Sequence, residues 1–134
     1  MIFILEDDAD RIEGFTSLLG DTPHHIERVV PEATEWLSAN KGQVRLYCLD
    51  NDLYVADYDG DEGEGWQLCE WILANAPKVP IMVHSTNTHA ATLMELACGE
   101  AGWDFHRIVP YLGTQWIEEQ WIGKVRDLLG VTEG

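Results

Sequence analysis

The stretch Leu46-Tyr47-Cys48-Leu49-Asp50-Asn51-Asp52-Leu53 organises the interpretation of this chain, because an apolar run ends abruptly there in two carboxylates flanking an amide. Short apolar runs rich in β-branched and aromatic residues are typical of buried strands. A carboxylate directly after such a strand lies at the carboxyl edge of a sheet, where open α/β folds bind their ligands. We therefore expect Asp50 and Asp52 to belong to a functional site.

Length and composition indicate one globular domain spanning residues 1–134, with 46% hydrophobic residues and enough chain for one good core. No run approaches the roughly 18 apolar residues that a membrane-spanning helix needs. The segment Met1–Leu5 lacks a basic region before it, so we interpret it as a buried strand and not a signal peptide. Three scattered cysteines argue against a disulfide framework or a zinc site. A cytoplasmic protein without a membrane partner is expected.

Charge is the strongest compositional feature, because 24 acidic residues face 8 basic ones and give a net charge of −16. Affinity for nucleic acid depends on Lys and Arg that neutralise phosphates, so an extended nucleic-acid surface is not expected. A phosphate ligand would need a bound metal or a few well-placed cations. Much of the charge can also serve only to keep the protein soluble.

Apolar patterning predicts five strands alternating with five helices. The strands are expected at residues 1–5, 25–30, 44–49, 80–83 and 103–109. The helices are expected at residues 9–19, from Pro31 to near Asn40, through Leu68 and Leu73, at residues 88–101 and at residues 114–129. Alternating βα units imply a parallel sheet with helices on both faces. The number of units fits a three-layer, flavodoxin-like fold with strand order 2-1-3-4-5.

In that order the first, third and fourth strands are neighbours, and polar clusters follow all three. The clusters are Glu6-Asp7-Asp8, Asp50-Asn51-Asp52 and His84-Ser85-Thr86-Asn87. Carboxylates gathered at one point repel each other unless a cation or a shared proton lies among them. Carboxylate oxygens are ligands that Mg²⁺ prefers, so we expect a divalent metal there. For Asp8 and Asp10, capping of the first helix is an equally open interpretation.

His84 is predicted to lie beside these carboxylates, which would raise its pKa and suit it to act as a general acid or base. Ser85 is placed to bind a phosphoryl oxygen. Asn87 could bind phosphate too, or could cap the helix that follows it.

The chain resembles response-regulator receiver domains at three places, which are Ile4–Asp8, Asp50 and Gly65. The resemblance implies that an acidic pair holds Mg²⁺ and that the strand-three aspartate accepts a phosphoryl group from a histidine kinase. Receivers have Thr or Ser at the end of the fourth strand, where this chain has His84 followed by Ser85. They also have a Lys before the proline after the fifth strand, where this chain has Val109. Arg11 and Arg107 are the basic residues expected to come nearest to the site.

The chain resembles, over nearly its whole length, a receiver-like family named for predicted cyclic-phosphate processing. The resemblance is carried by Glu6-Asp7-Asp8 with Arg11, Leu49–Leu53, Gly65, Val83–Asn87, Gly102-Trp103 and the helix with Trp116 and Trp121. The strand-three motif of that family generally reads Asp-His-Asp-Leu, and this chain has Asn51 at the histidine position.

The resemblance leads to the hypothesis of a metal-dependent phosphodiesterase-like enzyme acting on a small cyclic phosphate or a cyclic-phosphate RNA end. Glu6, Asp7 and Asp50 would hold Mg²⁺ or Mn²⁺, which would activate a water. His84 would protonate the leaving oxygen, and Asp52 would position the loop or a metal-bound water.

The residues expected to orient the phosphate are Arg11, Ser85 and Asn87. The expected partner is a small phosphate-containing ligand or a nucleic-acid end. One alternative is an atypical receiver phosphorylated on Asp50. A second alternative is a non-catalytic interaction module that kept the acidic pocket.

Overall fold

The computed structural model describes residues 1–111 and 113–130 of the chain. Five parallel strands form one sheet in the order β2-β1-β3-β4-β5, which confirms the flavodoxin-like order predicted from the sequence. The strands are β1 (Ile2–Leu5), β2 (His24–Glu27), β3 (Leu46–Leu49), β4 (Ile81–His84) and β5 (Phe105–Ile108). All neighbouring strands in this sheet are parallel, as alternating βα units require.

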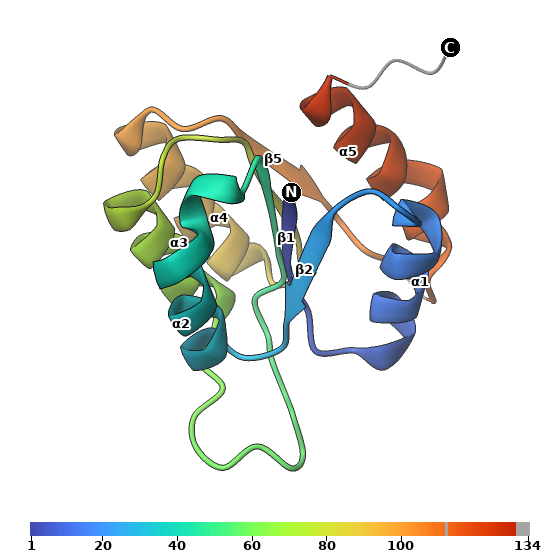
Figure 1. Cartoon of the computed structure of the whole chain (residues 1–134), viewed down its shortest axis with the longest axis horizontal. Helices are drawn as coiled ribbons and strands as arrows, with labels where there is room; N and C mark the ends of the chain where they lie inside the picture. The colour runs from blue at the N-terminus through green and yellow to red at the C-terminus, as the bar shows by residue number, and fades with distance from the viewer. Residues whose placement is uncertain (112, 131–134) are drawn as a thin grey trace.

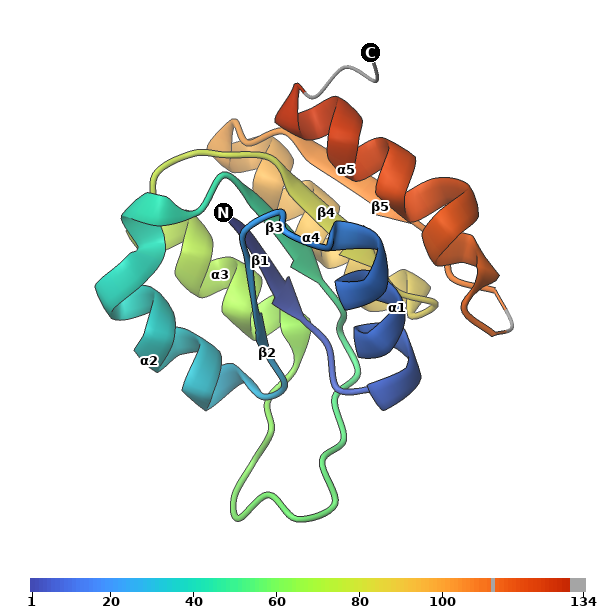
Figure 2. The same ribbon diagram turned by 45° about the vertical axis from the view of Figure 1, so that its right-hand side comes forward.

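Helices cover both faces of the sheet and complete the three layers (Figures 1 and 2). They are α1 (Ala9–Leu19), α2 (Val30–Asn40), α3 (Gly65–Asn75), α4 (Thr88–Ala101) and α5 (Ile122–Leu129), with a short helix η1 (Lys41–Gln43) and a π-helical turn η2 (Ile117–Trp121). Helices α2, α3 and α4 pack on one face, and α1, η2 and α5 pack on the other. No helix in the described ranges is long and apolar enough to cross a membrane.

Most strand ends lie within two residues of the predicted bounds, and two elements differ more. The second strand ends at Glu27 and not at Val30, because Val29 takes the N-cap position of α2 and Val30 starts that helix. The last helix is not uniformly α-helical over residues 114–129, because the π-helical turn η2 precedes α5. Both differences reflect helix-start geometry that apolar spacing does not encode.

Side chains alternate between the two faces along each central strand, as a period of two requires. In β1, Leu5 packs toward α2, α3 and α4, whereas Ile4 packs toward α1 and η2. Cys48 in β3 and Met82 in β4 lie on the same face as Ile4. Residues two positions further along these strands therefore point toward α1 and η2 as well.

Those residues are Glu6, Asp50 and His84. The parallel register pairs Leu5 with Leu49 and Leu49 with Val83, so the next residues of the three strands lie side by side at the carboxyl edge. Strand order, register and alternation together place two carboxyl groups and one imidazole on one face of one edge.

The connection from β3 to α3 projects beyond this edge as a long loop (Figure 1). Asp52 and Glu64 form an antiparallel bridge that closes the base of the loop. The Tyr54 N–H donates to Asp7 Oδ2 at 2.9 Å, which ties the loop to the start of the segment after β1. The loop is therefore anchored on the acidic residues at its base.

Candidate functional site

An acidic cluster forms at the carboxyl edge of β1 and β3, where Glu6, Asp7 and Asp50 each offer an oxygen within 4.8 Å of the other two. Glu6 is fully buried and Asp50 is 6% exposed. Glu6 Oε2 accepts the N–H groups of Asp7 and Asp8, each at 3.1 Å. Asp50 Oδ1 accepts the Asn51 N–H at 2.8 Å. The structure thus brings together the three residues predicted to hold a metal.

Burial raises the pKa of Glu6 to about 7, against the opposing charge of Arg11. Burial likewise raises the pKa of Asp50 to about 7, although His84 opposes the shift. Two buried carboxyl groups beside a third are costly to ionise without a cation among them. Their oxygens are the donors that Mg²⁺ and Mn²⁺ prefer, so this donor set fits a divalent cation.

Arg11 reaches the cluster from α1. Its Nη1 lies 3.5 Å from Glu6 Oε1 and 3.7 Å from Asp50 Oδ2. Asp8 sets the start of α1, because its Oδ1 accepts the N–H groups of Asp10 and Arg11. Asp8, and not Asp10, is therefore the N-cap that the sequence left open, and Arg11 lies in the first turn of the helix that it caps.

The buried side chains of His84 and Glu6 are within hydrogen-bond distance of each other. His84 Nε2 lies 2.9 Å from Glu6 Oε1, and the imidazole donates this hydrogen bond when Glu6 is ionised. The ring is fully buried, with Phe15 at 5.3 Å and Trp116 at 5.7 Å between centroids. Burial lowers the pKa of His84 to about 4, even though Asp50 favours the charged form.

The raised pKa that the sequence predicted for His84 is therefore wrong. The cost of desolvating an imidazolium exceeds the attraction of the neighbouring carboxylate. At neutral pH the ring is neutral.

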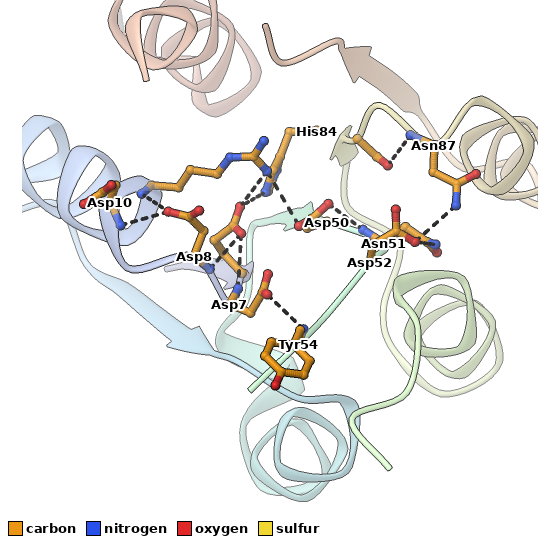
Figure 3. Close-up of polar contacts among 12 residues, drawn as sticks. Asp7, Asp8, Asp10, Asp50, Asn51, Asp52, Tyr54, His84 and Asn87 are labelled. Carbon is orange, nitrogen blue, oxygen red and sulfur yellow. Dashed lines mark hydrogen bonds and ion pairs between the residues drawn. The ribbon is translucent and has the colours of Figure 1, made fainter. Parts of the chain in front are cut away.

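Asp52 lies outside the acidic cluster, on the side of α3 and α4 (Figure 3). Its Oδ1 accepts from Asn51 Nδ2 at 3.0 Å and from Asn87 Nδ2 at 3.1 Å. Asn51 is fully buried, and its Oδ1 accepts the Trp66 N–H at 3.1 Å. The amide at the histidine position of the family motif thus joins the end of β3 to the first turn of α3.

Asn87 and Ser85 shape the start of α4. Asn87 Oδ1 accepts the Ala90 N–H at 3.0 Å, which makes Asn87 the N-cap, one of its two predicted roles. Ser85 is 2% exposed, and its Oγ accepts the Asn87 N–H at 3.0 Å. Arg107 Nη2 donates to the Ser85 carbonyl oxygen at 2.9 Å. Val109, where receivers have a lysine, is half exposed and supplies no cation.

Trp116 is the site neighbour that the sequence did not reveal. Its spacing with Trp121 indicated only a buried helix face. In the structure its ring lies 5.3 Å from the Arg11 guanidinium and stacks on His84. No local pattern links a residue after β5 to one in α1, so only the packing of α1 against η2 places it there.

Both the fold and the acidic cluster are found in a protein that matches a known family. The model of the family described as "Cyclic-phosphate processing Receiver domain" matches residues 1–100. The chain belongs to this family. It is a receiver domain of the response-regulator type. A comparison with curated proteins found no match.

Solved receiver domains share the fold of this cyclic-phosphate processing receiver domain. The BeF3-activated N-terminal receiver domain of Klebsiella pneumoniae RstA is 19% identical with a TM-score of 0.67, covering 96% of this chain and 97% of that one. The signal receiver domain of an HD domain-containing protein from Pseudomonas fluorescens Pf-5 is 16% identical with a TM-score of 0.69, covering 96% and 93%. The non-phosphorylated HemR receiver domain of Leptospira biflexa is 20% identical with a TM-score of 0.67, covering 99% and 96%.

Proposed function

We propose that this chain is an atypical receiver in which Asp50 accepts a phosphoryl group beside a divalent cation, Mg²⁺ or Mn²⁺, held among Glu6, Asp7 and Asp50. One observation carries the proposal. Asp50 directly follows β3 at the carboxyl edge of the sheet, and one of its oxygens lies within 4.8 Å of one oxygen of Glu6 and one of Asp7. Membership in a receiver family supports the same assignment.

Each residue has a defined part in this reaction. An oxygen of the Asp50 carboxylate attacks the phosphorus of the donor, the bond to the leaving group breaks, and an aspartyl phosphate forms. When bound, the cation neutralises charge on the carboxylates and on the incoming phosphoryl group. The Asp7 and Asp8 N–H groups and His84 fix the Glu6 carboxylate.

The residues that bind the phosphoryl oxygens would come from two other elements. Arg11 supplies positive charge from α1, as its distances to Glu6 and Asp50 allow. Ser85 and Asn87 lie where β4 passes into α4 and are proposed as further phosphate ligands. Asp52 would hold Asn87 in place through its hydrogen bond to the amide.

Two features favour a receiver over a phosphodiesterase. His84 has a pKa of about 4 and lies fully buried against Glu6, so at neutral pH it is not the imidazolium that would protonate a leaving group. Asn51, at the position of a family histidine, is fully buried and bonded to Trp66 and Asp52. Neither position offers an imidazolium to a substrate.

The test is incubation of the protein with a small phosphodonor and Mg²⁺, followed by intact-mass measurement. We expect one phosphoryl adduct in the wild type and none in Asp50→Asn. Asp57→Asn is the matched control, because Asp57 is an exposed aspartate of the loop after β3 that lies outside the acidic cluster, and it should keep the adduct. An adduct that persists in Asp50→Asn would remove Asp50 as the acceptor.

A second candidate function is metal-dependent hydrolysis of a small cyclic phosphate or a cyclic-phosphate RNA end. The description of the family and the contact of His84 with Glu6 favour it. Here His84 would protonate the leaving oxygen, with Asp50 and Asp52 as the other catalytic residues. Hydrolysis of a cyclic-phosphate panel that is lost in a folded His84→Gln variant would favour this candidate, whereas no hydrolysis by the wild type would favour the atypical receiver.

Calorimetry distinguishes the third possibility, a non-catalytic interaction module, from the two candidates above. Absence of Mg²⁺ and Mn²⁺ binding at millimolar concentration would favour it over both candidates above. We propose a small phosphate-containing partner, since the net charge of −16 disfavours an extended nucleic-acid surface. We also propose a reducing, cytoplasmic setting, which the free thiols of Cys48, Cys69 and Cys98 support.

A further inference from the structure

Arg11 occupies the position in which a cation is expected. Its Nη1 lies 3.5 Å from Glu6 and 3.7 Å from Asp50, which are two of the three carboxyl groups that make up the acidic cluster. One guanidinium therefore neutralises part of the charge that a divalent cation would neutralise. Because both cations are drawn to the same two carboxyl groups, they compete.

Trp116 gives the guanidinium a second contact that does not depend on the carboxylates. The Arg11 Cζ lies 5.3 Å from the centre of the Trp116 ring, within the range of a cation–π interaction. The ring itself is held firmly, because Trp116 is fully buried and its Nε1 donates to the Gly113 carbonyl oxygen at 3.1 Å. The guanidinium can leave the carboxylates and still remain at the edge of the cluster.

We propose that Arg11 is a resident counter-cation that a divalent cation displaces from Glu6 and Asp50, and that the released guanidinium then binds the phosphoryl group. This inference rests on the metal site of the proposed function and adds its regulation. Arg11 exchanges partners, from carboxylate oxygens in the metal-free protein to phosphoryl oxygens in the loaded one, while Trp116 limits how far it moves.

Removal of the Arg11 charge should have opposite effects on the affinities for the divalent cation and for the phosphoryl group. This pattern distinguishes the exchange from a merely structural role of Arg11. Without the Arg11 charge, a divalent cation meets no competitor, so its affinity rises. A charge at this distance, partly screened by water, corresponds to about a tenfold change in the dissociation constant. The phosphoryl group loses its cation, so its affinity falls. General damage to the site would lower both affinities.

Calorimetry with Mg²⁺ and with Mn²⁺ is the first part of the test, on the wild type, Arg11→Gln, Arg11→Lys and Arg28→Gln. Arg28→Gln is the matched control, because it removes the same charge close by. Among the described residues, Arg28 donates only to the Asp7 backbone oxygen, at 3.3 Å. The Arg11 side chain is 24% exposed on α1, so its variants are expected to fold, which circular dichroism checks. We expect Arg11→Gln to bind metal about tenfold more tightly than Arg28→Gln, and Arg11→Lys to stay near the wild type.

The second part measures binding of beryllofluoride, a phosphoryl analogue, at saturating metal. Arg11→Gln should bind it about tenfold more weakly than Arg28→Gln.

Four outcomes decide the matter. Equal metal affinities in Arg11→Gln and Arg28→Gln, or a loss of both affinities in Arg11→Gln, would overturn the exchange and leave the metal site standing. Metal binding by Arg11→Gln but not by the wild type would support it. No metal binding by either protein would overturn both the exchange and the proposed metal site.

Discussion

At the scale of single residues, Gly65 is where the backbone of α3 meets the end of β3. A Cβ atom at this position would lie 1.9 Å from the Asp50 carbonyl oxygen and 2.8 Å from the Asn51 Cα. The Gly65 N–H donates to the Asn51 carbonyl oxygen at 2.9 Å. Only a residue without a side chain allows this approach, and the approach fixes the backbone that carries the Asp50 carboxylate.

Gly65→Ala is expected to destabilise the protein by about 2–3 kcal/mol, because backbone atoms must move to accept the methyl group. Urea unfolding measures the change. Gly99→Ala in α4 is the control, since a Cβ there meets no described atom within 4 Å. It should be neutral or stabilising by up to about 1 kcal/mol, as alanine is the better helix former. Similar effects of the two variants would contradict the steric argument.

The shifted pKa values of Glu6, Asp50 and His84 make stability depend on pH. The folded-state pKa values of about 7 lie above the ordinary values of 4.5 for Glu6 and 3.8 for Asp50. Their contribution to the free energy of unfolding is present below those ordinary values and is lost as the pH rises through 7. His84 acts in the opposite direction, because its pKa of about 4 lies below the ordinary 6.5. Its contribution is present above pH 6.5 and is lost as the pH falls toward 4.

Above pH 6.5 the effect of the two carboxyl groups exceeds the opposing effect of the Met1 amino group, whose pKa burial lowers. Without divalent metal the protein should therefore lose about 1–3 kcal/mol between pH 6.5 and about pH 8. Urea unfolding in a chelator checks this. Asp50→Asn carries no charge to desolvate and should be more stable than the wild type at the higher pH. Addition of Mg²⁺ should restore the wild type and have little effect on Asp50→Asn. A wild type that gains stability over this pH range would contradict the predicted loss.

At the scale of elements, the residue that caps α4 also contacts the candidate site. Asn87 performs both functions with one side chain, because its Oδ1 caps the helix and its Nδ2 donates to Asp52. The two functions can be separated by substitution, since a serine hydroxyl caps a helix well but cannot also reach Asp52 in the same way.

Asn87→Ala should cost about 1–2 kcal/mol from the lost cap and the lost bond to Asp52. Asn87→Ser should recover most of this stability and still leave Asp52 without the amide. Thermal unfolding measures the first effect. If Asp52 positions Asn87 for the phosphoryl group, both variants should weaken beryllofluoride binding equally. Full recovery of binding in Asn87→Ser would show that only the cap matters.

At the scale of the whole molecule, the net charge of −16 sets a background of self-repulsion. Glu6 and Asp50 are acidic side chains that lie in the interior, and burial is the main reason why their pKa values are raised to about 7. Salt screens repulsion between surface charges and acts less on the buried ones.

Raising NaCl from a few millimolar to about 0.3 M should therefore raise the melting temperature by several degrees, a change of about 1 kcal/mol. Differential scanning calorimetry in a chelator measures it. Asp50→Asn should show nearly the same salt dependence, because Asp50 is buried and contributes little to the surface repulsion. A melting temperature that falls with added salt would mean that attractive surface pairs dominate.

The amino-acid sequence by itself determined the strand order and the residues of the acidic cluster. Apolar runs ending in polar residues fix where strands stop, and alternating βα units fix which strand ends are neighbours. Glu6, Asp7 and Asp50 could be placed together on those rules alone, because each rule depends on residues near in sequence.

Only the tertiary structure decided the state of the side chains in the cluster. His84 is neutral because Phe15 from α1 and Trp116 from beyond β5 bury it. Arg11 faces both Glu6 and Trp116 because α1 packs against η2. Burial and ion pairing depend on segments far apart in the chain, and no local pattern carries that information, since desolvation is a property of the whole packed environment.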